Sequence, residues 1–390
     1  MNTARCLYGG PLFDGQTLCP DGHVIIEDGK IASFGAGKPS LKCAALLDVQ
    51  GRLLAPGFVD LHSDALEKCI EQRPGARFDH VFALQGLDRR LAASGVTTFC
   101  HAVAFLDSQM GLRSPDAAAS IVRSVQEFAD SPRSLIRHGV HIRFEVGSRD
   151  SARTIQNLLQ HQPAALFSIM DHSPGQGQFK TMESFLHYYA ETYAISLERA
   201  ESIGRERAQK SSSAWDDSLG LLETVRSHGI PILSHDDDTV DKVDMAHALG
   251  ASGSEFPVSI EAATRAREKG MHVCMGAPNL IRGRSTNNNV AAADVLQAGL
   301  CDTLVSDYSP ESLPQSPFLA QRELGLDLGE SMRTVTANPG SLLATERLSP
   351  GRLRVGAEAD LVIIDRTEPW IQVWETWVGG RRVFAAHERA

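Results

Sequence analysis

His62 and Asp64 are the first residues of this 390-residue chain whose types and spacing suit chemistry. They follow a short apolar run over 58–61, and such a run predicts a buried strand. Because residues i and i+2 of an extended strand project to the same side, the imidazole and the carboxylate lie beside each other. That pair can bind a divalent metal ion at the C-terminal end of a strand, where catalytic barrels carry their sites.

Four further potential ligands recur at the C-terminal ends of predicted strands. They are Glu145 at the end of HIRFE, His172 at the end of FSIMDH, His235 at the end of PILSH, and Asp307 after TLVS. A single strand-end histidine is often a structural residue, but six such side chains around one point would leave costly buried charges unless a metal balanced them. The predicted metal ligands are therefore His62, Asp64, Glu145, His172, His235 and Asp307.

Nitrogen and oxygen ligands without thiolates suit zinc, manganese, iron or cobalt, and the residue types do not choose among them. We expect two ions per chain, zinc or manganese, because a carboxylate such as Glu145 can bridge two of them. The water or hydroxide between the ions then becomes the nucleophile. Asp307 is the predicted catalytic residue, which accepts the proton of that water and passes it to the leaving group.

The elements that must position these residues alternate between strands and helices. Apolar runs predict strands at 58–62, 96–101, 140–145, 165–172, 231–235, 252–256, 272–275 and 302–306. Amphipathic helices fit between them, for example at 116–129, 219–228, 259–269 and 291–298. This number of units predicts a (β/α)8 TIM barrel over 56–348. A doubly wound sheet is the alternative, but its glycine-rich phosphate turn is missing after the first strand.

Both ends of the chain read differently from the middle. Short apolar runs around tight turns at 1–55 and 349–390 predict that the two termini form one small β-sandwich. The polar segment at 179–213 is longer than an ordinary connection, so it predicts a helical insertion over the barrel mouth. That insertion is either a lid or a solvated hairpin without a role in chemistry.

Composition excludes several classes of protein. The formal charge of -10 argues against nucleic acid or an anionic membrane as the main partner. Seven scattered cysteines without a Cys-x-x-Cys pair argue against a disulfide framework. No signal peptide or membrane span is evident, so we expect a cytoplasmic protein with a small-molecule substrate. Three tryptophans near the C-terminus, Trp370, Trp374 and Trp377, predict either sandwich core or a homo-oligomer contact.

The order of these motifs resembles the amidohydrolase superfamily of metal-dependent hydrolases. PGFVDLHSD at the start, the strand-end ligands and AEADLVIID near the end carry that resemblance over nearly the whole chain. Longer strings resemble the α-D-ribose 1-methylphosphonate 5-triphosphate diphosphatases of phosphonate breakdown. Those strings are HSDALEK with QRPGAR, MDHSPGQGQF, SHDDDT, SEFP, MGAPNLIRG and SDYSPESL.

The resemblance implies hydrolysis of a phosphorylated sugar: a metal-bound hydroxide attacks phosphorus, and the products are the 5-phosphate and diphosphate. Cations and an amide in or beside the matched strings are then the expected substrate-binding residues, although any one of them can be a solvated surface group. They are Lys68, Arg73, Arg77, Gln176, Lys180, Arg282 and Arg284. Two rival functions remain: hydrolysis of an N-acyl amino acid or lactam, and binding of a metabolite without turnover.

Two departures from the family pattern bear on these expectations. The segment GRSTNNN at 283–289 replaces a Gly-Gly-Ser-His-Ser-Gly-Asn stretch, so a histidine is absent and Arg284 is added. The superfamily's second metal usually takes histidines from strands 5 and 6, yet His172 and His235 fall on strands 4 and 5 here. Either the strand count is one out, or Glu255 on strand 6 replaces a histidine. We favour the two histidines.

Overall fold

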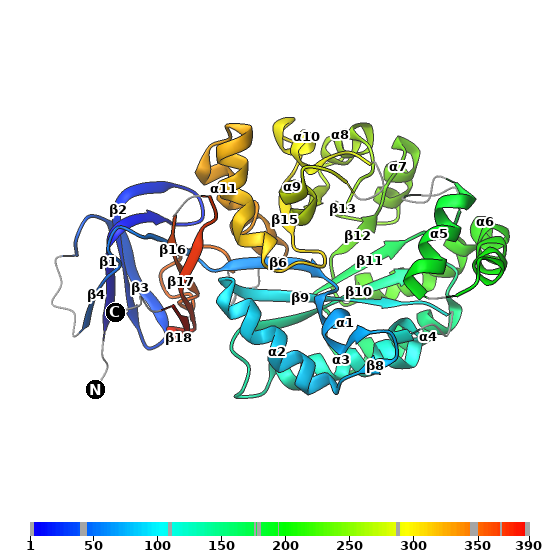
Figure 1. Cartoon of the computed structure of the whole chain (residues 1–390), viewed down its shortest axis with the longest axis horizontal. Coiled ribbons are helices and arrows are strands. Elements are labelled where there is room, and N and C mark those ends of the chain that lie inside the picture. The colour runs from blue at the N-terminus through cyan, green and yellow to red at the C-terminus, as the bar shows by residue number, and fades with distance from the viewer. Residues whose placement is uncertain are drawn as a thin grey trace.

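The computed structural model describes residues 4–39, 45–107, 111–174, 177, 181–193, 195–285, 289–343, 350–366 and 369–386. Parallel strands form a barrel, and strands from both ends of the chain form a separate sheet beside it (Figure 1). The predicted fold class, a (β/α)8 TIM barrel with a small β-sandwich formed by both chain termini, is confirmed, and the described terminal strands belong to one sheet. The domain boundaries at 55/56 and 348/349 stay a prediction.

The barrel contains every predicted strand, in chain order around the sheet. Its strands are β6 (Phe58–Ser63), β9 (Val96–Phe105), β10 (Arg137–Glu145), β11 (Leu166–Met170), β12 (Ile232–His235), β13 (Gly253–Glu255), β14 (His272–Gly276) and β15 (Thr303–Val305). A parallel bridge between Ser63 and Asp307 brings the first strand to the end of the last. There the backbone N–H of Asp307 donates to His62 O at 2.9 Å.

The alternation of residues along β10 explains how the barrel exposes a functional face. Ile142 and Phe144 point into the hydrophobic core between the barrel and its helices. His141, Arg143 and Glu145 take the intervening positions, so they share the opposite face of the strand, inside the barrel. Polar side chains are therefore carried into the barrel by a strand that is otherwise apolar.

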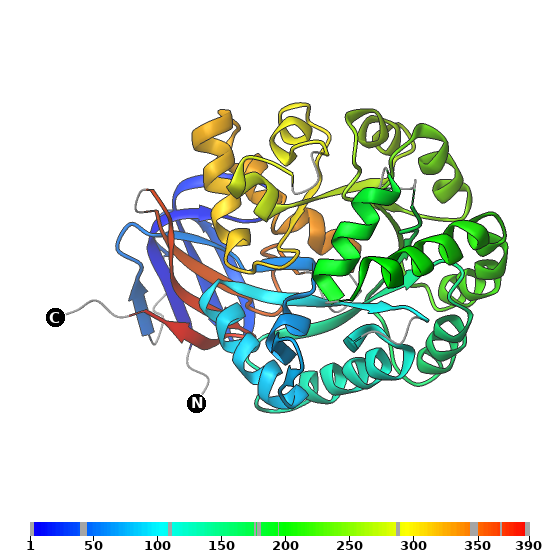
Figure 2. The ribbon, with the colours of Figure 1, turned by 45° about the vertical axis from the view of Figure 1, so that its right-hand side comes forward.

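Helices cover the outside of the barrel (Figure 2). They are α1 (Ala65–Ile70), α2 (His80–Ala93), α3 (Pro115–Ala129), α4 (Arg149–Leu159), α7 (Val240–Ala248), α8 (Ile260–Glu268), α9 (Ala277–Arg282), α10 (Ala292–Gln297), α11 (Ser312–Leu324), α12 (Leu328–Arg333) and α13 (Ala337–Leu343). A short hairpin, β7 (Glu71–Arg73) and β8 (Ala76–Arg77), follows α1. No helix in the described part of the chain is long and apolar enough to span a bilayer.

The segment after β11 is helical and extends beyond the insertion predicted at 179–213. It comprises α5 (Met182–Tyr193) and α6 (Leu197–Ser227), which pack against each other around Phe185, Tyr189, Ala200 and Ile203. The expected separate helix at 219–228 is wrong in its start, because α6 runs through that region without a break. In Figure 2 this hairpin lies in front of the barrel strands.

The second sheet joins the two ends of the chain. Its strands are β1 (Arg5–Phe13), β2 (Leu18–Glu27), β3 (Lys30–Ala36), β4 (Ala45–Asp48), β5 (Leu53–Pro56), β16 (Leu361–Asp365), β17 (Gln372–Val378) and β18 (Arg381–Ala385). The contact between the two ends is antiparallel pairing of β5 with β16. Trp377 is buried in the core of this sheet, Trp374 packs against that core, and Trp370 is half exposed.

Candidate metal centre

A cavity of about 530 Å³ opens at the C-terminal ends of the barrel strands. Its acidic, basic and imidazole lining residues are Asp64, Lys68, Arg113, Arg143, His172, His235, Asp236, Arg282 and Asp307. Aromatic side chains line it from two directions, with Tyr188 and Tyr189 on α5 and Phe256 and Tyr308 after β13 and β15. The cavity therefore offers potential metal ligands and cations in one polar space.

One group of possible ligands consists of His172, His235 and Asp236. Asp236 Oδ2 lies 3.4 Å from His172 Nε2 and 3.1 Å from His235 Nδ1. Burial alone would raise the pKa of Asp236, but the neighbouring His235 and His172 outweigh burial and hold that pKa well below its usual range. Asp236 has a φ of 55°, so the chain turns sharply after β12 and brings the carboxylate back toward the imidazole of His235.

Glu145 holds His172 in place from the end of the neighbouring strand. Its Oε1 accepts from the backbone N–H of His172 at 2.8 Å, and its Oε2 lies 2.7 Å from His172 Nδ1. Burial would lower the pKa of His172, but the carboxylates of Glu145 and Asp236 outweigh it and raise that pKa. Because Nδ1 of His172 is engaged by Glu145, its Nε2 faces Asp236. The predicted role of Glu145 as a bridge between two ions stays a prediction.

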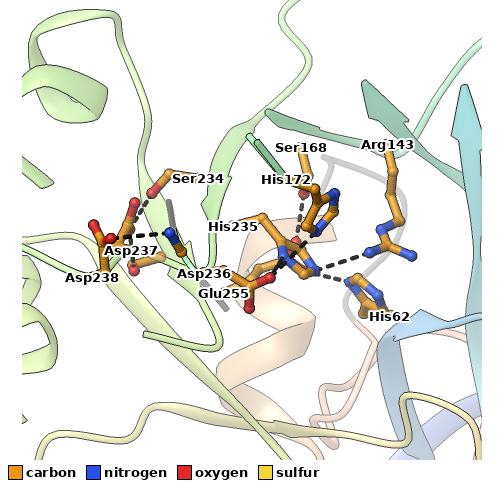
Figure 3. Close-up of polar contacts among 12 residues, drawn as sticks. His62, Arg143, Ser168, His172, Ser234, His235, Asp236, Asp237, Asp238 and Glu255 are labelled. Carbon is orange, nitrogen blue, oxygen red and sulfur yellow. Dashed lines mark hydrogen bonds and ion pairs between the residues drawn. The ribbon is translucent and has the colours of Figure 1, made fainter. Parts of the chain in front are cut away.

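The second group consists of His62, His141 and Glu255, all buried inside the barrel. His62 Nδ1 lies 3.0 Å from Glu255 Oε1, and the hydroxyl of Ser168 donates to Glu255 Oε2 at 2.5 Å (Figure 3). His141 contacts the same hydroxyl at 2.6 Å through Nε2, and its Nδ1 lies 2.8 Å from Leu61 O. Burial lowers the pKa of His62 to about 3, so the imidazole is neutral, as a metal ligand must be.

Asp64 and Asp307 lie side by side where the barrel closes. The backbone N–H of Asp64 donates to Asp307 O at 2.7 Å. Burial, and then the negative charge of Asp64, raise the pKa of Asp307 to about 7. Burial and Glu67 likewise raise the pKa of Asp64, and Arg113 lies 3.5 Å from its carboxylate. A carboxyl group that titrates near neutrality is suited to exchange protons during a reaction.

The structure gathers the predicted ligands at the barrel mouth. Asp64, His172, His235 and Asp307 line the cavity. The rings of His62 and His235 are 5.5 Å apart, and Glu145 contacts His172. The strand count was right: β11 ends at Met170, just before His172, and β12 and β13 end with His235 and Glu255. Glu255 therefore does occupy the sixth position, opposite His62.

The predicted substrate-binding residues separate into three sets. Lys68 and Arg282 line the cavity. Arg73, Arg77 and Arg284 are exposed and are not among its described lining residues, and Arg77 pairs with Glu71 at 2.8 Å. Gln176 and Lys180 lie outside the described residues.

Several residues of the site were missed by the sequence reasoning. Arg143 and His141 share one face of β10 with Glu145, so the period of two along that strand would have found them. Arg113 ends a short 3₁₀ helix (Gly111–Arg113), and Tyr188 and Tyr189 lie on α5, so none of the three has a strand-end signal. Asp236 follows His235 directly in the sequence, and the structure places it within reach of both His172 and His235.

A divalent cation fits the first group better than the second. His235 Nδ1 and Asp236 Oδ2 are buried and have no hydrogen-bond partner among the described residues, although they lie close together. Such a pair of buried polar atoms is costly unless a cation binds it. Glu255 and His141, in contrast, already use both of their polar atoms within their own network. That network fixes the orientation of His62 beside the first group.

The comparisons with known proteins agree with this geometry. No model of a known protein family matches the chain. It is similar to the α-D-ribose 1-methylphosphonate 5-triphosphate diphosphatase of Escherichia coli strain K12, at 33% identity over 93% of this chain and 96% of that protein. A dihydroorotase of Syntrophus aciditrophicus strain SB is 22% identical over 95% of this chain and 92% of its own length.

A solved N-acetyl-D-glucosamine-6-phosphate deacetylase of Mycobacterium smegmatis shares the fold, with a TM-score of 0.66 and 16% identity over 97% of this chain and 100% of that chain. The barrel, its terminal sheet and these relatives define the class: the chain belongs to the amidohydrolase superfamily of hydrolytic enzymes. Within it, the chain belongs to the family of the Escherichia coli α-D-ribose 1-methylphosphonate 5-triphosphate diphosphatase.

Proposed function

We propose that this protein hydrolyses a phosphoric anhydride of a phosphorylated sugar, releasing diphosphate. The specific substrate proposed is α-D-ribose 1-methylphosphonate 5-triphosphate, on which the relative that is 33% identical acts by its name. The observation that carries the proposal is the lining of the cavity, where Lys68, Arg143 and Arg282 stand beside a group of possible metal ligands. A polyanion complements such a surface better than a neutral amide does.

The residues of the cavity divide the work of this reaction. His172, His235 and Asp236 would hold a divalent cation, which on binding would neutralise phosphoryl oxygens and acidify water. Water forms a bond to the α-phosphorus while the bond from that phosphorus to the bridging oxygen breaks. Asp307 accepts the proton of the water, and the proton then passes to the diphosphate. Lys68 and Arg282, at the exposed rim, bind the outer phosphates.

Diphosphate release from purified, metal-loaded protein tests this function. We expect turnover of the ribose triphosphate to the 5-phosphate with one diphosphate per event, measured by a coupled diphosphate assay. The matched control is Asp307→Asn, which should fold and release diphosphate at least about 100-fold more slowly. An absence of diphosphate release by the metal-loaded parent protein overturns the proposal.

Hydrolysis of a cyclic amide is the second candidate. Its support is the named activity of relatives such as the dihydroorotase, which matches 95% of this chain at 22% identity. Turnover of lactams or N-acyl amino acids, without diphosphate release from triphosphates, would favour it. The two functions are separable in one set of assays, because only the first produces diphosphate.

A further inference from the structure

Arg143 places a buried positive charge at the inner wall of the cavity. It lies near the C-terminal end of β10, and 8% of it is exposed, whereas Lys68 and Arg282 are exposed at the rim. Its neighbours in register are Ala104 on β9 and Ser168 on β11, which are small and uncharged. The fold therefore leaves room around the guanidinium, which points into the cavity beside His235 (Figure 3).

Nothing in the described part of the chain neutralises this charge at contact distance. Arg143 Nη2 donates to His235 Nε2 at 3.1 Å, and no carboxylate oxygen of the described residues lies within 4.0 Å of its guanidinium. Its Nε is buried and has no hydrogen-bond partner among those residues. A buried guanidinium without an ion pair is costly in free energy, so its position indicates an anionic ligand.

The nearby carboxylates do not remove the need for an anion. Arg143 favours the ionised forms of Asp64 and Asp307, but neither carboxylate lies within 4.0 Å of its guanidinium. A cation bound by His172, His235 and Asp236 would compete with Arg143 for the negative charge of Asp64 and Asp307. N–H groups of the guanidinium then remain available to an anionic ligand, and they face the cavity where a substrate would bind.

We propose that Arg143 binds the phosphoryl group under attack, donating from its guanidinium to two nonbridging oxygens of the α-phosphate. This inference rests on the proposed function and adds a specificity residue to it. A guanidinium fork matches two phosphoryl oxygens in one plane, and it holds the negative charge that those oxygens carry in the transition state. The carbonyl of an amide under attack offers a single uncharged oxygen, so at the reacting centre Arg143 favours a phosphoryl group over an amide.

The alternative role for Arg143 is structural, to hold His235 in position. The two roles separate in binding measurements, because ribose 5-phosphate carries the phosphate that stands for the attacked group. Arg143→Met removes the charge at similar length, and Arg143→Lys keeps the charge without the fork. Arg89→Met, an exposed position on α2 that does not line the cavity, is the matched control.

We expect Arg143→Met to weaken ribose 5-phosphate binding by metal-loaded protein about 30-fold or more and Arg143→Lys by about 5- to 10-fold, measured by calorimetry. Arg89→Met should match the parent. Metal content of the loaded variants should stay equal to that of the parent. Ribose 5-phosphate affinity within about 3-fold of the parent in Arg143→Met overturns the inference, as does loss of metal together with equal loss of affinity in both variants.

The outcome is separable from failure of the proposed function. If the parent protein releases no diphosphate but loses ribose 5-phosphate binding on Arg143→Met, the phosphoryl subsite stands and the assigned reaction does not. If the parent releases diphosphate and Arg143→Met does so at an unchanged kcat/KM, the reaction stands and the subsite is refuted. Should Arg143→Met not fold, Arg143→Lys still decides, because a structural role predicts that any loss of phosphate affinity there comes with an equal loss of metal.

Discussion

At the scale of single residues, the burial of Asp307 beside Asp64 makes the stability of the fold depend on pH. Its carboxyl group is enclosed beside Asp64, and burial together with that charge raises its pKa to about 7. An unfolded aspartate ionises near its usual pKa of 3.8, so between that pH and about 7 the unfolded state releases a proton that the folded state keeps. Stability is therefore fully present at low pH and is lost as pH rises through this window.

This loss of stability with rising pH gives a prediction for Asp307→Asn in metal-free protein. The amide cannot ionise, so the variant should melt about 2–5 °C higher than the parent at pH 8 and at the same temperature at pH 4. Differential scanning calorimetry at the two pH values measures the difference. A variant that is destabilised equally at both values would show that Asp307 contributes a structural hydrogen bond and no ionisation penalty.

His101 gives a second prediction at this scale, away from the cavity. It is buried on β9, with Nε2 2.9 Å from His138 Nδ1, and His138 in turn contacts Asp88 on α2. Burial, and then His138, hold the pKa of His101 well below its usual 6.5. As pH falls below about 6.5 the unfolded histidine takes up a proton and the folded one does not, so stability falls.

We expect His101→Gln to reduce this acid sensitivity. Between pH 7.5 and 5.5, the free energy of unfolding of the parent should fall more steeply than that of the variant, by up to about 1.4 kcal/mol per pH unit. Urea unfolding across the range measures it. His161→Gln, at an exposed position, serves as the control. Parallel pH profiles for parent and His101→Gln would show that His101 does not titrate on unfolding.

The sequence identified those site residues whose position follows from the secondary structure, and missed those whose position depends on a local backbone angle. Glu145 and His235 end their strands and His62 is the last residue but one of β6, and this position alone placed them at the mouth. The three aspartates after His235 look alike in the sequence, but the structure separates them. Asp236 turns to the histidines, whereas Asp237 accepts from Ser234 and Ser254 and Asp238 accepts from the backbone of Gly177. The positive φ of Asp236 causes this difference in side-chain direction, and no pattern in the sequence predicts that angle.

At the scale of elements, the barrel strands were predictable because each is a compact apolar run between polar helices. The helical insertion was predictable only in outline. Residues 219–228 look like a helix in their own right, and nothing in the sequence indicates that α6 begins at Leu197 and continues through them. Packing against α5 decides that, since a helix of this length is stabilised mainly by tertiary contacts.

Two glycines of α6 test whether this hairpin positions the aromatic lining of the cavity. A Cβ on Gly204 would lie 2.9 Å from Met182 Sδ and 3.0 Å from the Phe185 ring, both on α5. A Cβ on Gly220 would meet nothing within 4 Å. Both changes to alanine improve helix propensity by about 1 kcal/mol, but only the first displaces α5.

We expect Gly204→Ala to raise KM about 3- to 10-fold with kcat within about 2-fold, because α5 carries Tyr188 and Tyr189 into the cavity. Gly220→Ala should leave both constants unchanged and raise the melting temperature slightly. Steady-state kinetics on the two variants make the comparison. Equal KM values would show that the hairpin covers the barrel without contacting the substrate.

At the scale of the whole molecule, the question is how two ends of the chain become part of one structure. The sandwich-like sheet was predictable from hairpin signals at both ends, and pairing of β5 with β16 joins them. Its attachment to the barrel was not predictable, because it depends on side chains far apart in sequence. Thr376 on β17 donates to the backbone oxygen of Ala92 at the end of α2 at 2.7 Å. Arg137, at the start of β10, binds Asp360 just before β16.

The Arg137–Asp360 pair gives the prediction that belongs to this scale. Arg137 Nε lies 2.8 Å from Asp360 Oδ2 and its Nη2 lies 3.0 Å from Oδ1, which is a bidentate contact between barrel and sheet. Asp360 Oδ1 also accepts from the backbone N–H of Gly379 at 2.8 Å. The aspartate side chain is 9% exposed and the arginine side chain 27% exposed, so solvent screens this pair less than it screens surface pairs.

A double-mutant cycle with Arg137→Met and Asp360→Asn should give a coupling energy of about 1–3 kcal/mol in urea unfolding. The control cycle uses Arg205 and Glu201, an exposed pair one turn apart on α6, for which about 0.5 kcal/mol or less is expected. If both cycles give the same small coupling energy, the Arg137–Asp360 pair does not stabilise the contact between the barrel and the terminal sheet. A large coupling seen only in Arg137–Asp360 would show that the terminal sheet stabilises the barrel that carries the site, because the energy is shared between residues 223 positions apart.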